Sequence, residues 1–294
     1  MAASVYYSIA GHILRIEGDK VCDLLNHSMY GFSVFETENT KYEWQIVFND
    51  NVTRPEEWTE LYSCTFDVGN MMGTLAKVGD TYYFAMDPLD DSDVSPLIMR
   101  YSFGSDTLEA TGYVSPVNLR FALWMATGML SMNSKMLLIH SSCVVHQNKA
   151  VLCLGESGTG KSTHTRLWLK YIPDSHLLND DSPVLAFENG EAVVYGSPWS
   201  GKTHCYHQKR FPLAAAIRLS QAPYNKIRRL GIVESLSALH PSCPPALAQD
   251  DRYQDFIVEL LSDVLGCVPV YHLECLPDEA AAWTSHDAIF GPVK

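Results

Sequence analysis

The stretch that decides most about the fold is Gly155-Glu156-Ser157-Gly158-Thr159-Gly160-Lys161-Ser162. It fits the pattern G-x-x-x-x-G-K-[ST], in which a glycine-rich loop joins a β-strand to an α-helix. An apolar run, residues 150–154, comes directly before the loop, and residues 161–171 after it have the composition of a helix. The order strand, loop, helix argues against a chance match of glycines and predicts a P-loop.

A loop of this kind binds phosphate through its backbone. Glycines allow successive N–H groups to point inward, and the helix N-terminus adds partial positive charge. We expect Lys161 to contact the β- and γ-phosphates of a nucleoside triphosphate and the Ser162 hydroxyl to be a metal ligand. The full set of expected nucleotide contacts is Gly155, Ser157, Gly158, Thr159, Gly160, Lys161, Ser162 and Thr163. The predicted cofactors are ATP, or GTP, with Mg²⁺, or Mn²⁺ in its place.

Two adjacent carboxylates follow the next predicted strand. Asp180 and Asp181 come after the apolar pair Leu177-Leu178. The helix carries the chain away from the loop, and a strand is able to bring it back beside the phosphates. A nearby cation would keep both carboxylates ionised, and the one less engaged with the metal could accept a proton from a hydroxyl. The alternative is that the pair caps a helix or turn, where Asp is common.

Three pieces of sequence resemble the bacterial HPr kinase/phosphorylase and phosphoenolpyruvate carboxykinase group of P-loop proteins. They are, in order, Ile139-His140-Ser141-Ser142, the loop 155–162 and Asn179-Asp180-Asp181. The resemblance is specific over about residues 140–181 and thinner to about residue 202. It implies the α/β fold of that group, with an α+β mixed sheet, for the catalytic part of the chain.

The resemblance also implies roles for individual residues. His140 would lie near the metal or the transferred phosphate, whereas a lone His beside an apolar strand is otherwise more often structural. One Asp would be the general base and the other a metal ligand; we assign the base to Asp180 and the ligand, together with Ser162, to Asp181. The order of the two stays open. The expected catalytic residues are therefore Asp180, His140 and Lys161.

The chain departs from both branches of that group. It has no clear copy of the glycine- and arginine-rich signature of HPr kinases, and the Lys and Arg residues that carboxykinases use are not identifiable. We therefore predict an ATP- and Mg²⁺-dependent kinase that transfers a phosphoryl group to a hydroxyl, either Ser of a peptide or protein or a small molecule. The alternatives are a carboxykinase-like enzyme and a non-catalytic nucleotide-binding switch.

A glycine- and proline-containing segment, residues 196–203, has the composition of a substrate-side loop, with Lys202 available for a phosphate. An ordinary exposed turn is the alternative.

The N-terminal part of the chain has a different pattern from the rest. Short β-branched and aromatic runs at residues 42–48, 61–66 and 81–85 are separated by turn signals, which predicts a mostly antiparallel sheet. Asn118 is a candidate cap for an apolar helix extending to about residue 132. We place the domain boundary between residues 115 and 116, with a β domain of unknown role at 1–115 and the kinase-like domain at 116–294.

Strands and helices alternate in the predicted kinase-like domain. The strands expected beside the loop are 136–146 and 150–154, joined by the turn 147–149, and a hairpin is expected at 184–195 around Asn189-Gly190. A helix at about 251–265, a strand at 268–273 and a last helix beginning near residues 277–279 complete the predicted elements.

The net charge, the length of the apolar runs and the cysteine spacing indicate which kinds of partner and compartment to expect. The 294 residues carry a formal net charge of −13, which argues against a broad electrostatic contact with nucleic acid or an anionic membrane. No apolar run approaches about 18 residues and the N-terminus does not resemble a secretory signal, so we expect a cytoplasmic protein. The eight cysteines are scattered, which predicts neither disulfides nor structural zinc. The expected partners are a nucleoside triphosphate and a hydroxyl acceptor, and the oligomeric state, including a homo-oligomer, stays open.

Overall fold

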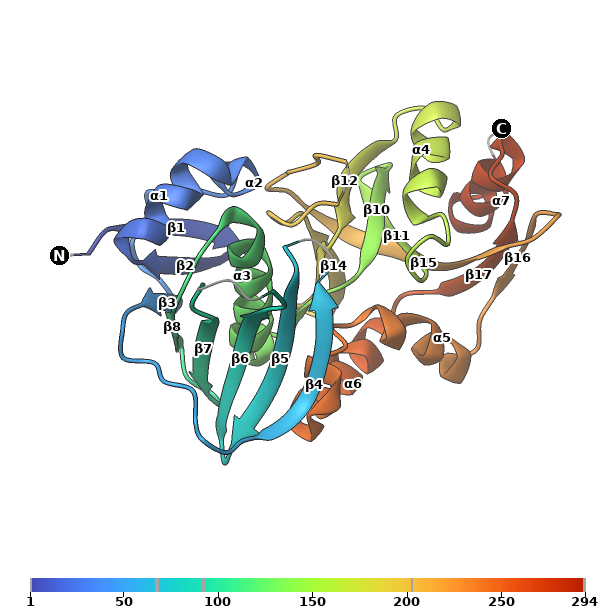
Figure 1. The fold of residues 1–294 in the computed structure, drawn as a ribbon. Helices are drawn as coiled ribbons and strands as arrows, with labels where there is room; N and C mark the ends of the chain where they lie inside the picture. Colours follow the sequence, from blue (N-terminus) through green and yellow to red (C-terminus); the bar gives the residue numbers. More distant parts are fainter. Residues whose placement is uncertain (1, 67–68, 91–93, 202, 293–294) are drawn as a thin grey trace. The chain divides into compact units, whose positions relative to one another are not determined.

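The computed structural model describes residues 2–66, 69–90, 94–201 and 203–292 of a mixed α/β protein with two sheets (Figure 1). The chain divides into two compact units. Unit 1 comprises Met1–Ser134 with Ala246–Tyr253, and unit 2 comprises Lys135–Pro245 with Gln254–Lys294. The first division of the chain thus falls after residue 134 rather than after residue 115, where the sequence analysis placed it.

Unit 1 contains an eight-stranded sheet. Its strands are β1 (Ser4–Ile9), β2 (His12–Glu17), β3 (Trp44–Phe48), β4 (Thr59–Phe66), β5 (Met71–Val78), β6 (Thr81–Pro88), β7 (Leu97–Ser102) and β8 (Thr107–Thr111), in the order β1-β2-β3-β8-β7-β6-β5-β4. The described strands pair mostly antiparallel, as predicted, but β3 runs parallel to both of its neighbours, β2 and β8. The sheet is therefore mixed.

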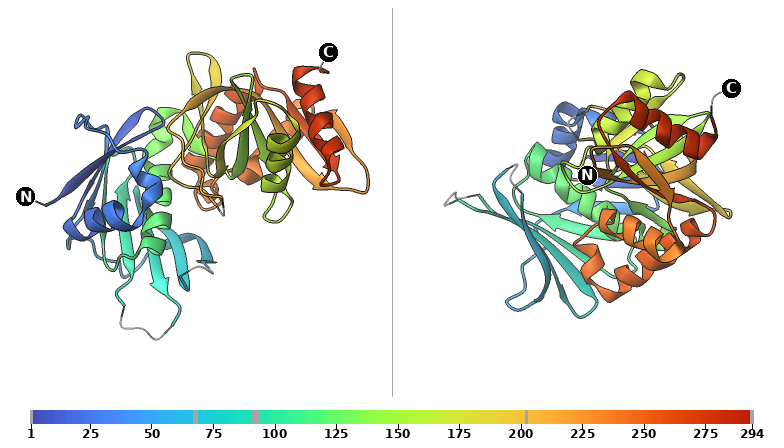
Figure 2. Two further views of the ribbon diagram at one scale, coloured as in Figure 1. Left: turned by 90° about the horizontal axis from the view of Figure 1, so that it is seen from above. Right: turned by 90° about the vertical axis from the view of Figure 1, so that its right-hand side faces the viewer.

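The helices of unit 1 explain why the boundary differs. They are α1 (Asp19–Ser28), α2 (Tyr30–Ser33), α3 (Pro116–Leu130) and the 3₁₀ segments η1 (Ser131–Ser134) and η3 (Leu247–Gln249). α3 contacts α1 and the strands β6, β7 and β8, so it belongs to the first sheet and not to the P-loop unit (Figure 2). α3 also starts earlier than predicted: Ser115 is its N-cap, and the Asn118 side chain accepts a hydrogen bond from the Ser115 backbone N–H at 2.7 Å. α1 was not predicted from the sequence.

Unit 2 is built on a sheet with a parallel centre. Its strands are β9 (Met136–Leu138), β10 (Ser141–His146), β11 (Lys149–Leu154), β12 (His176–Asp181), β13 (Val184–Glu188), β14 (Glu191–Tyr195), β15 (Arg210–Gln221), β16 (Lys226–Arg229) and β17 (Val270–Cys275). The order is β12-β10-β11-β15-β14-β13-β9, and β17 pairs with both β15 and β16. β11, β15 and β17 are parallel, so their carboxyl ends lie at one edge, where open α/β sheets bind ligands.

Most predicted elements of unit 2 occur where the sequence placed them. The hairpin β13–β14 turns at Asn189-Gly190, both with positive φ, and the helices α4 (Lys161–Tyr171), α6 (Asp251–Leu265) and α7 (Glu279–Phe290) are present. The predicted strand 136–146 is instead two strands that break at Ile139 and His140, because β9 pairs with β13 whereas β10 pairs with β11 and β12. β15, β16, α5 (Ile232–Leu239) and the 3₁₀ segment η2 (His240–Ser242) were not predicted. Among the described residues, no helix is both long and apolar enough to cross a membrane.

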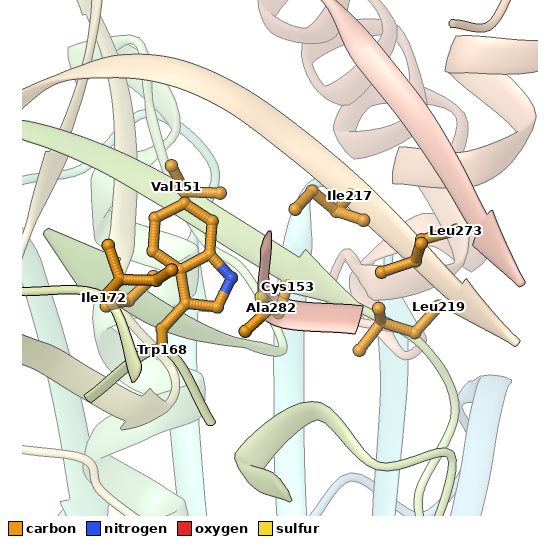
Figure 3. Close-up of a cluster of buried hydrophobic side chains, with 9 residues drawn as sticks. Val151, Cys153, Trp168, Ile172, Ile217, Leu219, Leu273 and Ala282 are labelled. Carbon is orange, nitrogen blue, oxygen red and sulfur yellow. The ribbon is translucent and has the colours of Figure 1, made fainter. Parts of the chain in front are cut away.

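Helices α4 and α7 pack against one face of the unit 2 sheet. The buried cluster between them and the strands comprises Val144, Val151, Cys153, Trp168, Ile172, Ile217, Leu219, Leu273 and Ala282 (Figure 3). Trp168 is fully buried, and its Nε1–H lies 2.9 Å from Ser285 Oγ and 3.2 Å from His164 Nε2. This core fixes α4, the helix that begins at the P-loop.

A buried histidine in this core predicts loss of stability in acid. Burial lowers the pKa of His164 from about 6.5 to about 4. Between these pH values the imidazole binds a proton in the unfolded chain but not in the folded one. The free energy of unfolding therefore falls as the pH drops from about 6.5 toward 4, by about 2 kcal/mol at pH 5 from this residue alone. Burial also lowers the pKa of His146, which adds a contribution of the same sign.

Urea unfolding at pH 7 and pH 5 measures this effect. The free energy of unfolding should differ less between pH 7 and pH 5 in His164→Gln than in wild type. In the control His27→Gln, which alters an exposed imidazole, this difference should keep its wild-type size. An equal difference in wild type and His164→Gln would contradict the prediction.

Candidate functional site

The P-loop connects β11 to α4 in a conformation that leaves the helix N-terminus open. Gly158 and Gly160 have φ angles of 81° and 112°, in the left-handed region that favours glycine. The Thr159 hydroxyl donates to the Glu156 carbonyl oxygen at 2.8 Å, which tightens the loop. No side chain of the described chain caps the first turn of α4, whose N-cap is Gly160. The N–H groups of that turn are therefore suited to binding an anion.

Lys161 reaches back across the loop. Its Nζ donates to the carbonyl oxygens of Gly155 at 2.7 Å and Glu156 at 3.2 Å, and it lies 3.0 Å from His140 Nε2. The three protons of the ammonium group thus each have an acceptor. Burial lowers the pKa of Lys161, while the nearby Asp181 carboxylate opposes that shift.

His140 links Lys161 to the second carboxylate. It lies at the break between β9 and β10, and its backbone N–H donates to the Ser242 carbonyl oxygen at 2.7 Å. An ammonium group only donates, so with Lys161 protonated His140 Nε2 is the acceptor and the ring hydrogen is on Nδ1. Nδ1 faces Asp181 Oδ1 at 3.4 Å. The side chains Lys161, His140 and Asp181 therefore form a continuous polar chain.

The two carboxylates of β12 point to opposite faces of the sheet, as successive residues of a strand do. Asp180 is 5% exposed, and its Oδ1 accepts a hydrogen bond from Ser162 Oγ at 2.8 Å. The Asp181 side chain is 34% exposed. The carboxylate beside the metal-ligand candidate Ser162 is thus Asp180 and not Asp181.

Residues 196–201 of the predicted substrate-side loop lie directly beside the Asp pair. Asn179 Nδ2 donates to the carbonyl oxygens of Ser197 and Trp199 at 3.3 and 3.0 Å, and the Gly201 N–H donates to the Asp180 carbonyl oxygen at 2.7 Å. A Cβ atom at Gly201 would lie 2.9 Å from that same oxygen, so the close approach requires glycine. Lys202 lies outside the described residues.

Two cavities adjoin the P-loop. One, of about 690 Å³, is bordered by the first turns of α4 and has mostly apolar walls; its lining includes Thr163, His164, Leu167, Leu219, Cys275 and Leu276. The other, of about 470 Å³, is lined mostly by polar residues, which include Glu156, Ser157, Arg218, Ser220 and His272. Arg218 was not predicted as a site residue, although a charged residue inside the apolar run 213–219 is a signal that could have identified it.

The donors present fit a metal ion that takes few protein ligands. Among the described residues, no group of three or more His, Cys, Asp or Glu side chains could hold a metal. Ser162 and Asp180 instead offer a hydroxyl and a carboxylate 2.8 Å apart. Such oxygen donors suit Mg²⁺, which usually retains waters and binds substrate phosphates in addition to one or two carboxylates.

Comparisons with known proteins do not assign the chain to a family, because no family model and no curated protein matches it. The resemblance carried by the three motifs therefore stays a prediction.

Proposed function

We propose that unit 2 binds a nucleoside triphosphate with Mg²⁺ and transfers its terminal phosphoryl group to a hydroxyl. The observation that carries the proposal is the convergence of Lys161, His140, Ser162 and both Asp residues on one P-loop. A glycine-rich loop alone binds phosphate, whereas an additional carboxylate and imidazole supply the groups that proton transfer requires.

The contacts favour the reverse of the predicted order for the two carboxylates. Ser162 and Asp180 would hold the metal, because their oxygens are already adjacent and Asp180 is buried. Asp181 would be the general base, because its carboxylate is partly exposed and accessible to a substrate hydroxyl, while His140 and the Ser182 hydroxyl hold it in place. Bound Mg²⁺ would neutralise charge on the phosphates.

The other polar groups have supporting roles. Lys161 would exchange one or both loop carbonyl oxygens for the oxygens of the β- and γ-phosphates. His140 would orient Asp181 through its Nδ1–H and lie beside the transferred phosphoryl group.

We further propose that unit 2 has the fold of the HPr kinase/phosphorylase and phosphoenolpyruvate carboxykinase group. The support is topological: the hairpin β10–β11 leads into the P-loop, His140 precedes β10, and the Asp pair ends the neighbouring strand β12. The acceptor would be a Ser of a peptide or protein, or a hydroxyl of a small molecule.

Substitution of the P-loop lysine tests nucleotide binding. Lys161→Ala is expected to weaken ATP binding by roughly 10- to 100-fold, because it removes a charge-assisted contact with the β- and γ-phosphates. Calorimetric titration of ATP with Mg²⁺ measures the change, and Lys170→Ala, at the exposed end of α4, is the control.

Phosphate transfer from ATP to a pool of serine-containing peptides and metabolites then tests the reaction. Acceptor-dependent transfer by wild type that is lost in Lys161→Ala supports a kinase. Tight ATP binding without transfer to any acceptor would replace the proposal with a nucleotide-binding switch, and equal ATP affinity in wild type and Lys161→Ala would refute the proposed site.

A further inference from the structure

A cation on β15 lies beside the beginning of the P-loop. Arg218 pairs in register with Leu154, the last residue of β11, and the loop opens directly after it. Arg218 Nη2 lies 3.5 Å from Glu156 Oε1; the Arg218 side chain is 22% exposed, whereas that of Glu156 is 85% exposed. An ion pair with so exposed a partner is weak, so another anion can displace Glu156 at low cost.

The polar cavity gives the guanidinium group a place for a ligand. Arg218 shares its lining with the loop residues Glu156 and Ser157, and with Ser220 and His272, whose Oγ and Nε2 lie 2.9 Å apart. A cation, a hydroxyl, an imidazole and a backbone loop suit a phosphate group better than an apolar ligand.

The two cavities also indicate the direction of a bound nucleotide. The apolar cavity borders Thr163 and Leu167 of α4 and suits a nucleoside. Lys161 Nζ, which would contact the β- and γ-phosphates, lies at the other end of the loop, against the Gly155 and Glu156 carbonyl oxygens. The terminal phosphate would therefore lie at the Glu156 end, which is the end that Arg218 faces.

We propose that Arg218 binds the terminal phosphate of the nucleoside triphosphate, releasing Glu156 as it does so. This inference rests on the proposed nucleotide site and adds a residue to it. A guanidinium group presents a planar set of donors that matches phosphate oxygens, and it stabilises the charge of a phosphoryl group in transfer. Glu156 is then a competitor that occupies Arg218 while the loop is empty.

Binding of two nucleotides that differ only at the terminal phosphate tests the proposal. The full chain is titrated, with Mg²⁺, against ADP and against the β,γ-imido analogue of ATP. Arg218→Gln is expected to weaken the analogue by roughly 10- to 100-fold and ADP by less than about threefold. Glu156→Gln should not weaken binding of the analogue, whose affinity should stay the same or rise. Arg228→Gln is the matched control, because Arg228 pairs with Glu234 on exposed surface of the same unit.

Several outcomes would overturn the inference. One is that Arg218→Gln weakens neither nucleotide or weakens both equally. Another is that Glu156→Gln weakens the analogue as Arg218→Gln does, because the ion pair would then be purely structural. If Arg218→Gln does not fold, Arg218→Lys is used in its place. A preference for the analogue over ADP that is several-fold smaller in Arg218→Lys than in wild type supports the proposal, and an unchanged preference overturns it. If wild type binds neither nucleotide, the proposed function itself is refuted. If wild type binds both nucleotides and Arg218→Gln keeps the wild-type preference for the analogue over ADP, only the role of Arg218 is refuted.

Discussion

Asp181→Asn is expected to slow phosphoryl transfer by about 10²- to 10⁴-fold, the usual contribution of a general base. The amide cannot accept a proton from the acceptor hydroxyl, but it keeps the shape of the side chain beside His140. ATP affinity should change little, because the Ser162–Asp180 contact and the Lys161 contacts remain. The loss should therefore appear in the rate of transfer at saturating ATP.

Asp180→Asn separates the two roles of the carboxylate pair. Asp180 lies against Ser162, so its neutral variant should need more Mg²⁺ for half-maximal activity, whereas Asp181→Asn should keep the wild-type Mg²⁺ requirement. The measurement is transfer of labelled phosphate to an acceptor that wild type uses, at several Mg²⁺ concentrations. Asp263→Asn, which alters a carboxylate paired with Lys135, is the control. Full activity in Asp181→Asn, with a slow rate in Asp180→Asn at saturating Mg²⁺, would restore Asp180 as the base.

The elements around the P-loop could be predicted because their signals are local. The loop glycines, the apolar strand before them and the Asn189-Gly190 turn each specify backbone conformation within a few residues. The mixed α/β class and the mostly antiparallel first sheet were also predictable, since strand runs and turn signals alternate along the sequence.

Features that depend on pairing were not predictable. The break at His140 arises because β9 and β10 pair with different strands, which no local pattern reveals. Which of the two carboxylates lies beside Ser162 depends on the pairing of β12 with β10, which places Asp180 opposite Ser142. Arg218 is 57 positions after Lys161 in the sequence (218 − 161), and only the parallel pairing of β15 with β11 brings it to the loop.

α3 was grouped with the kinase-like domain because its sequence does not show which sheet it packs against. α3 is nearly uniformly apolar, so its sequence shows that it is buried but not which sheet covers it. In the structure α3 packs against β6, β7 and β8, which precede it in unit 1.

Trp168→Ala is expected to lower the free energy of unfolding of unit 2 by about 3–5 kcal/mol, the usual cost of removing a buried large aromatic side chain. Trp168 is fully buried in the cluster between α4, α7 and the sheet that also contains Val151, Ile217 and Ala282. The change also leaves Ser285 Oγ and His164 Nε2 without the indole N–H that now points at them. Urea unfolding followed by far-ultraviolet circular dichroism measures the loss.

Two variants of α4 show whether the loss arises from packing. Leu169→Ala, one position along on the same helix but 40% exposed, should change stability by less than about 0.5 kcal/mol. Trp168→Phe should fall between wild type and Trp168→Ala, because it keeps a ring in the core while removing the N–H donor. Since α4 also carries Lys161 and Ser162, Trp168→Ala should weaken ATP binding while Leu169→Ala does not. Equal stability of Trp168→Ala and Leu169→Ala would show that this core does not fix the helix on which the proposed site depends.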